Sequence, residues 1–135
     1  IRERSRTVYI GKPDSKIDET LKITNEGVEK AIENTKPGNT CHDVAVAFWS
    51  VLEKYGLEKE SRCGYSIGLG YPPDWGEHTL SIRKNEKTVL YPNVTYHLMA
   101  GMWMDTWGLE ISESIRVTEN GCELFCDFPR SLHLV

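Results

Sequence analysis

The chain has 135 residues, of which 39% are hydrophobic and 27% are charged, and its formal net charge is -4. These values are typical of one soluble globular unit, and the acidic balance argues against nucleic acid as a partner. The apolar runs are far shorter than the roughly 20 residues that cross a bilayer, and the first residues lack the apolar core of a signal peptide, so the sequence predicts no membrane contact and a cytoplasmic location.

The first part of the chain predicts one short strand and two helices. Residues 6–11 alternate and contain β-branched side chains, which favours a strand that ends at the Gly-Lys-Pro-Asp sequence of residues 11–14. Apolar residues then recur at helical spacing from Ser15 to Asn34. A capping box from Thr40 to Asp43 predicts the start of a second helix, and Gly56 stands where a left-handed C-terminal cap is expected.

After Arg62 the periodicity changes from 3.6 to 2, which predicts a series of strands. The Asn-Gly pair at residues 120–121 is typical of a tight hairpin, because both residues tolerate positive φ. The predicted class is α+β, a single unit over residues 1–135 with two helices packed on a curved, mainly antiparallel sheet. The predicted strands cover residues 65–69, 79–83, 88–91, 94–103, 109–117 and 122–126.

Residues 64–78 have the sequence GYSIGLGYPPDWGEH, which reads as a strand followed by a loop stiffened by prolines. Such a loop is costly to order, and loops that combine Pro, Trp, Glu and His are often where ligands are held. We therefore expect this stretch to form one wall of a site. The four cysteines are widely spaced and lack the pairing of a structural zinc site, so we expect reduced, mostly buried thiols.

Four motifs give the chain a resemblance to a known superfamily. They are TKPGNTCHDV, GYSIGLGYPPDWGEH, LYPNVTYHLMAGMW and GLEISESIRVTENGCELFC. In this order they resemble the second half of the pita-bread fold of the creatinase, aminopeptidase P and methionine aminopeptidase superfamily. Arg6-Thr7 resembles the Arg-Thr pair that follows the second metal-binding aspartate in the first half. The resemblance implies that the chain is a C-terminal fragment of a larger domain and that the parent protein forms a homodimer.

The same resemblance implies that three metal ligands are replaced. The positions of the superfamily's C-terminal histidine and two glutamates hold Tyr65, Met99 and Ser112. A phenol, a thioether and a hydroxyl are poor ligands for a pair of hard divalent ions, so we expect no metal and no other cofactor. The sequence GYSIGLGYPPDWGEHT and the terminal Cys-Asp-x-Pro-Arg further resemble the ectoine hydrolase branch, which is metal-free and opens a C–N bond of a small zwitterionic cyclic amidine.

Candidate site residues follow from the chemistry of such a substrate. An amidinium cation is recognised by carboxylates and aromatic faces, a substrate carboxylate needs donors, and a histidine can move a proton during attack by water. The catalytic candidates are His78, His97 and Tyr65, and the substrate-binding candidates are Glu77, Trp75, Trp103, Glu110 and Ser112. Each has a structural alternative, because a buried histidine, a core tryptophan or a solvated carboxylate is common in any fold.

Three functions stay open at this point. The first is a metal-independent hydrolase of the ectoine hydrolase type, the second is a metallopeptidase of the Xaa-Pro dipeptidase or aminopeptidase P type, and the third is a non-catalytic binding module that reuses the fold. Replacement of the metal ligands disfavours the second, and the polar stretch with Glu77 and His78 disfavours the third. The catalytic nucleophile is expected outside these residues, so the isolated chain is expected to be inactive.

Overall fold

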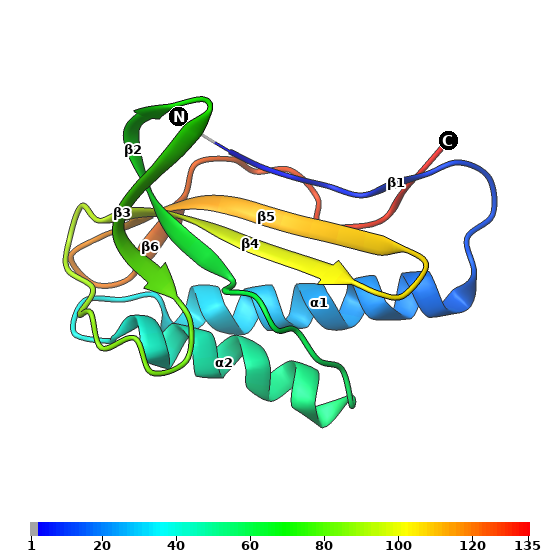
Figure 1. Ribbon diagram of the computed structural model, residues 1–135, viewed down its shortest axis with the longest axis horizontal. Coiled ribbons are helices and arrows are strands. Elements are labelled where there is room, and N and C mark those ends of the chain that lie inside the picture. The colour runs from blue at the N-terminus through cyan, green and yellow to red at the C-terminus, as the bar shows by residue number, and fades with distance from the viewer. Residues whose placement is uncertain (1–2) are drawn as a thin grey trace.

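The computed structural model describes residues 3–135, in which two helices lie beneath a twisted sheet (Figure 1). Helix α1 (Ser15–Asn34) begins after Asp14, whose side chain accepts the N–H of Lys16. Helix α2 (Cys41–Lys54) begins with the predicted capping box, in which Thr40 and Asp43 bond to each other's backbone N–H groups. These caps satisfy donors that a helix leaves without partners, so both helix starts are fixed by local sequence.

The end of α2 confirms the role predicted for Gly56. This glycine has φ +69, and its N–H bonds to the carbonyl of Glu53 while the N–H of Leu57 bonds to the carbonyl of Leu52. The two bonds form the Schellman pattern that satisfies the last helical carbonyls and requires a left-handed residue at this position. Neither α1 nor α2 is long and apolar enough to cross a bilayer, and these are the helices of residues 3–135.

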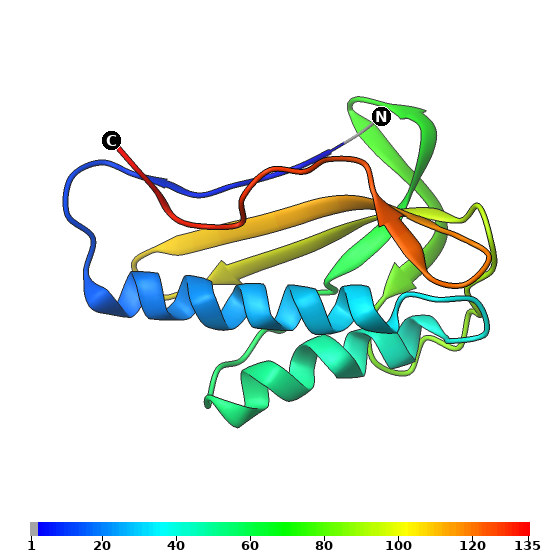
Figure 2. The same cartoon turned by 180° about the vertical axis from the view of Figure 1, so that it is seen from behind.

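Five antiparallel strands form the sheet above the helices, in the order β3-β2-β4-β5-β6. A separate parallel pair joins β1 (Val8–Tyr9) to β7 (His133–Leu134), so the two ends of the described chain run side by side along β5 (Figure 2). The predicted α+β class is therefore confirmed. The sheet strands are β2 (Gly64–Tyr71), β3 (Asp74–Ile82), β4 (Thr95–Trp103), β5 (Gly108–Val117) and β6 (Cys122–Leu124).

The hydrophobic core fills the space between the helices and one face of the sheet. Phe48 and Leu52 from α2 lie in one buried cluster with Tyr96 and Leu98 from β4, and all four side chains are fully buried. Alternate residues of a strand point to opposite faces, so the neighbours of Tyr96 and Leu98 point away from the helices. That outer face carries the polar side chains of Tyr65, His97 and Ser114.

Three local expectations differ from the structure. Residues 88–91 do not form a strand of the sheet, because their backbone groups bond to residues 38–41 at the start of α2. The expected loop after residue 69 is a β-hairpin, in which β2 and β3 continue to a turn at the cis-linked Pro72-Pro73. The hairpin from β5 to β6 is present, yet Asn120 and Gly121 are not among the residues with positive φ, so the turn uses a different backbone geometry.

Candidate functional site

The register of three neighbouring strands brings polar side chains together on the outer face of the sheet. Tyr65 of β2 lies directly opposite His97 of β4, and His97 lies directly opposite Ser114 of β5. Residues directly opposite in an antiparallel pair share a face, with Cβ atoms about 5 Å apart. The rings of Tyr65 and His97 are T-shaped with centroids 5.2 Å apart. Two predicted catalytic candidates are thus adjacent.

Hydrogen bonds connect four side chains, which we call the Glu3–His97 cluster: Glu3, Tyr65, Trp75 and His97. The Tyr65 hydroxyl donates to Glu3 Oε2 at 2.7 Å and accepts the indole N–H of Trp75 at 2.9 Å. His97 Nδ1 lies 2.8 Å from the same Glu3 oxygen and 2.9 Å from the Tyr65 hydroxyl. The predicted residues Tyr65, Trp75 and His97 therefore meet around a carboxylate from the far end of the chain.

The hydrogen-bond pattern assigns the proton of the His97 ring. Because Tyr65 gives its single proton to Glu3, the contacts of His97 Nδ1 are satisfied when Nδ1 carries the proton. In the neutral ring Nε2 is then an acceptor. Within residues 3–135, both His97 Nε2 and Glu3 Oε1 are buried without a hydrogen-bond partner. The cluster thus has two acceptor atoms that could accept hydrogen bonds from a ligand or from an ordered water.

The surroundings of the cluster keep the imidazole and the phenol uncharged at neutral pH. Burial lowers the pKa of His97 to about 4, while the Glu3 carboxylate at Nδ1 works in the opposite direction because it stabilises the imidazolium. Burial, followed by the hydrogen bond to Glu3, raises the pKa of Tyr65 to about 12. The cluster therefore combines one carboxylate with a neutral base and a phenol donor.

Glu3 is the member that sequence reasoning missed. It arrives through the N-terminal strap, which we define as residues 3–7 running along β5. The strap is held where the N–H of Ser5 donates to Ser112 Oγ at 2.6 Å and where Ser114 Oγ donates to the Glu3 carbonyl at 2.6 Å. One signal in the sequence could have indicated it. Glu3 lies three positions before Arg6-Thr7, and in the superfamily the corresponding Arg-Thr pair follows the second metal-binding aspartate.

A buried ion pair anchors the strap. The Arg6 guanidinium, whose side chain is 7% exposed, pairs with Glu113, which is 1% exposed. Arg6 also donates to the carbonyls of Ser5, Ser112, Pro129 and Phe128. Because removal of one partner would leave an uncompensated buried charge, this pair fixes the position from which Glu3 reaches His97.

Two of the predicted site residues lie on the β2–β3 hairpin outside the cluster. His78 has φ +56, lies where the pairing of β2 with β3 shifts register, and has a side chain that is 70% exposed. Its Nε2 contacts Asp74 Oδ2 at 2.7 Å. The carboxylate of Glu77 accepts the N–H of Gly70 within the same hairpin. The catalytic role of His78 and the binding role of Glu77 stay predictions, and the contacts of both are local.

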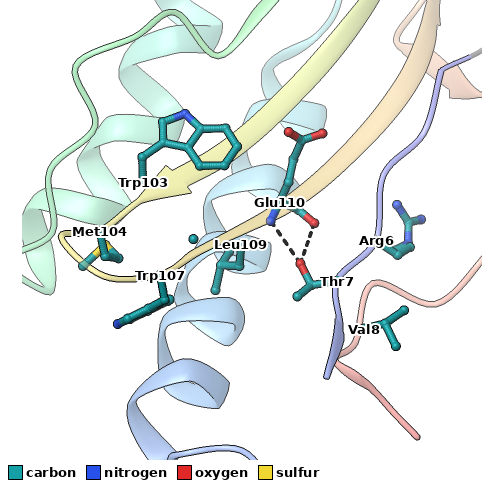
Figure 3. Close-up of a pocket in the computed structure, with 9 residues that line it drawn as sticks. Arg6, Thr7, Val8, Trp103, Met104, Trp107, Leu109 and Glu110 are labelled. Carbon is teal, nitrogen blue, oxygen red and sulfur yellow. Dashed lines mark hydrogen bonds between the residues drawn. The ribbon is translucent and has the colours of Figure 1, made fainter. Parts of the chain in front are cut away.

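Trp103 and Glu110 lie at the other end of the same sheet face. Six positions of β4 separate Trp103 from His97, which corresponds to roughly 20 Å at the rise of a β-strand. The two residues line an open hollow of about 510 Å³ between the strap and the β4–β5 turn (Figure 3). Glu110 lies opposite Gly101, four positions or roughly 13 Å from His97, so neither residue belongs to the Glu3–His97 cluster and the predicted binding residues form two separate groups.

The positions that the resemblance identifies with metal ligands lie close together but are poor donors. Met99 and Ser112 are directly opposite on β4 and β5, and Ser112 is fully buried with its hydroxyl used by Ser5. The hydroxyl of Tyr65 is used by Glu3 and Trp75. Across residues 3–135, no three His, Cys, Asp or Glu side chains lie close enough to hold a metal ion. The observed contacts of Ser112 are structural, and its substrate contact stays a prediction.

Comparison with known proteins finds similarity to a hydrolase and to peptidases. The chain is 50% identical over 129 residues to the ectoine hydrolase of Halomonas elongata, a match that covers 95% of this chain and 32% of that protein. The crystal structure of dipeptidase PepE from Mycobacterium ulcerans superposes with a TM-score of 0.89 at 26% identity, covering 98% of this chain and 35% of that one.

An X-Pro aminopeptidase from Thermotoga maritima superposes with a TM-score of 0.88 at 26% identity, covering 98% of this chain and 37% of that one. The chain thus spans about a third of the length of the relatives that it matches. The predicted fold, half of a pita-bread domain, is confirmed by these structures. The model of the metallopeptidase family M24 matches residues 3–119. The chain therefore belongs to the metallopeptidase family M24.

Proposed function

We propose that this chain contributes part of the active site of a hydrolase that opens a C–N bond in a small cyclic amidine. The observation that carries the proposal is the Glu3–His97 cluster, in which a buried carboxylate oxygen and a buried imidazole nitrogen have no partner within residues 3–135. The 50% identity to a protein named ectoine hydrolase supports ectoine, or a close analogue, as the substrate.

The cluster suits an amidinium and an attacking water because together they offer the donors that the two acceptors need. An amidinium carries N–H donors and one delocalised positive charge, so Glu3 Oε1 can accept a charge-assisted hydrogen bond from it, while His97 Nε2 accepts a hydrogen bond from the attacking water. Burial strengthens these bonds, because the surrounding dielectric is low. The Trp75 indole and the Tyr65 hydroxyl hold the acceptors in place.

The same atoms can move the proton that hydrolysis requires. When water adds to the amidine carbon, His97 Nε2 accepts the proton of the attacking water, and Glu3 stabilises the resulting imidazolium through Nδ1–H. Cleavage of the ring C–N bond then leaves an amide, and the departing nitrogen takes the proton back as an amine. One water is consumed, and no redox partner is needed.

We propose further that the reaction does not use a metal. The family name implies divalent ions, but the residues at the three positions present a phenol, a thioether and a buried hydroxyl. Both oxygens of this set are already engaged, the phenol by Glu3 and Trp75 and the hydroxyl by Ser5, so the three side chains do not fit hard divalent cations. No step above is assigned to a metal.

Activity is proposed for the whole protein rather than for these 135 residues alone. The match covers about a third of each relative, so two thirds of the relatives' length has no counterpart in the chain. Further groups that position the substrate and the attacking water are expected in that remainder. The isolated chain is therefore proposed to bind weakly and to be inactive.

The test uses the complete natural protein after treatment with a chelator, with ectoine as substrate and amine release as the readout. We expect turnover without added metal. His97→Gln should lower kcat/KM by about 10²-fold or more, because a positioned general base contributes at least that much. His78→Gln tests the other histidine candidate: because its exposed imidazole lies outside the cluster, its kcat/KM should stay within about threefold of the wild type if the cluster carries the chemistry.

Other outcomes would favour the two alternative functions. Hydrolysis of dipeptides only after divalent metal is restored would establish a metallopeptidase and contradict the proposal. Saturable binding of ectoine without any turnover would indicate a binding module. A loss in the His78 variant with none in the His97 variant would place the chemistry on the β2–β3 hairpin instead of the cluster.

A further inference from the structure

The indole of Trp103 forms a flat platform at the end of β4. Trp103 is 65% exposed, yet its ring lies directly over two glycines of the same sheet face. A Cβ added at Gly101 would lie 2.7 Å from one ring carbon, and a Cβ added at Gly108 would lie 2.8 Å from another. Only glycine leaves room for this close approach, so one ring face packs on backbone and the other faces solvent.

The carboxylate of Glu110 stands beside this platform, and no described residue forms a hydrogen bond or ion pair with it. Glu110 lies directly opposite Gly101, and its side chain rises from β5 next to the Trp103 indole (Figure 3). Its backbone is held by Thr7, whose hydroxyl bonds to both the N–H and the carbonyl of Glu110. No ion pair or hydrogen bond joins the Glu110 carboxylate to another group in the part of the chain that the structure describes.

The cations near the hollow are already engaged. Arg6 lines it, but its guanidinium bonds to Glu113 and to four backbone carbonyls. Lys59 interacts electrostatically with Glu110 but donates to the carbonyl of Gly101 at 2.7 Å and to Ser61 Oγ at 2.8 Å. An aromatic face and a carboxylate that forms no hydrogen bond or ion pair within residues 3–135 therefore share one open hollow.

We propose that the Trp103–Glu110 hollow binds a planar organic cation of the amidinium or guanidinium type. Such a cation can stack on an indole through cation–π attraction and can donate two parallel N–H bonds to one carboxylate. A compact ammonium ion is more strongly hydrated and lacks the planar shape, so it matches this pair less well. Glu110 supplies the charge that selects a cation, and Trp103 supplies the face that selects a flat one.

This site is independent of the reaction proposed above. The rise of a β-strand puts Trp103 roughly 20 Å from His97, and Glu110, which lies opposite Gly101, roughly 13 Å from it. The constituents of this site are Trp103, Glu110 and the two supporting glycines, none of which belongs to the Glu3–His97 cluster. If the protein does not hydrolyse an amidine, the proposed cation binding at Trp103 and Glu110 is unaffected. If no cation binds there, the proposed hydrolysis at the Glu3–His97 cluster is likewise unaffected.

The test is a titration of acetamidinium chloride into the complete natural protein labelled with ¹⁵N, with the tryptophan indole N–H signals as the readout. The Trp103 signal is assigned by its loss in Trp103→Leu. We expect a saturable shift of that signal, and no shift with acetamide, which has nearly the same shape without the charge. Glu110→Gln should weaken acetamidinium binding about tenfold, because one charge-assisted pair is lost. The matched control, Glu119→Gln, changes the net charge equally at an exposed position and should stay within about twofold.

Three results would overturn the proposal. The first is an acetamidinium titration that leaves the Trp103 signal unchanged. The second is an equal response to acetamide, which would show that the charge is not recognised. The third is an equal loss of affinity in Glu110→Gln and Glu119→Gln, which would reduce the effect to general electrostatic attraction.

Discussion

The two ends of β4 use the same sheet face in opposite ways. At one end His97 is 3% exposed and lies beneath the β2–β3 hairpin side chains and the strap, while at the other end Trp103 is 65% exposed. Burial at the first end makes the imidazole neutral and leaves two acceptors without a partner among residues 3–135. Exposure at the second end leaves an aromatic face and a carboxylate open to a ligand. The chemistry of each end thus depends on what covers the face.

The side chains at the two ends of β4 are held in place in different ways. The Glu3–His97 cluster is held by hydrogen bonds among residues from the strap, β2, β3 and β4, so it depends on long-range packing. The Trp103 platform is held by two glycines within β4 and β5. We therefore expect perturbation of the strap to affect the cluster first, and changes at the glycines to affect the platform alone.

The largest effect is expected from breaking the anchor of the strap. Glu113→Gln removes the carboxylate that faces Arg6 and that lies 3.4 Å from Arg130 Nη1. Arg6 then loses its counter-charge, whereas Arg130 keeps Glu29 at 3.7 Å. We expect the free energy of unfolding to fall by about 3 kcal/mol, because an uncompensated buried charge is left. Denaturant unfolding of the wild type and the variant measures this loss.

A surface ion pair provides the control for that variant. Glu123 pairs with Arg116 on the β5–β6 hairpin, and their side chains are 48% and 35% exposed. Glu123→Gln should cost less than about 1 kcal/mol because solvent screens exposed pairs. An equal cost for the two variants would mean that the strap is not anchored by its buried charge.

The second effect is a pH dependence of stability that arises at the cluster. Burial lowers the pKa of His97 from 6.5 to about 4. Between these two values the His97 imidazole is protonated in the unfolded chain but neutral in the folded protein. As the pH falls from 6.5 towards 4, the free energy of unfolding should decrease by up to about 1.4 kcal/mol per pH unit from this residue. Above pH 6.5 both states are neutral at His97, and the contribution is constant.

Replacement of the imidazole isolates this contribution. His97→Gln cannot take up a proton, so its stability should fall less steeply than that of the wild type between pH 6.5 and 4. His78→Gln removes an exposed imidazole and should retain the steep slope. Parallel curves for the wild type and His97→Gln would show that the Glu3 carboxylate cancels the effect of burial on His97.

Much of the fold could be predicted because its signals are local. The capping box at Thr40 and the glycine at position 56 fixed the limits of α2, and the alternation of residues 94–103 and 109–117 indicated the two central strands. Residues 88–91 also contain β-branched side chains, but their carbonyl and N–H groups bond to the start of α2. Nothing within those four residues distinguishes a sheet partner from a helix terminus.

The candidate site was predictable only where neighbouring strands supply it. Tyr65 and His97 share a face because β2 pairs with β4, and the resemblance had already indicated both positions. Glu3 is separated from His97 by most of the chain, so its place depends on the packing of the strap. Trp103 and Glu110 were grouped with the cluster by chemical type, and only the length of β4 separates them from it.

The smallest effect on stability is expected from a change beneath the Trp103 indole. In Gly101→Ala the new Cβ would lie 2.7 Å from a Trp103 ring carbon, so the exposed ring must lift from the sheet. The free energy of unfolding should change by less than about 1 kcal/mol, because the gain from replacing a strand glycine offsets the lost ring contact. Acetamidinium binding should weaken about threefold as the cation–π contact is lost. The Glu3–His97 cluster should keep its pH dependence, since the two ends of β4 share no side-chain contact. A variant that altered both ends together would show that the sheet face is one coupled surface.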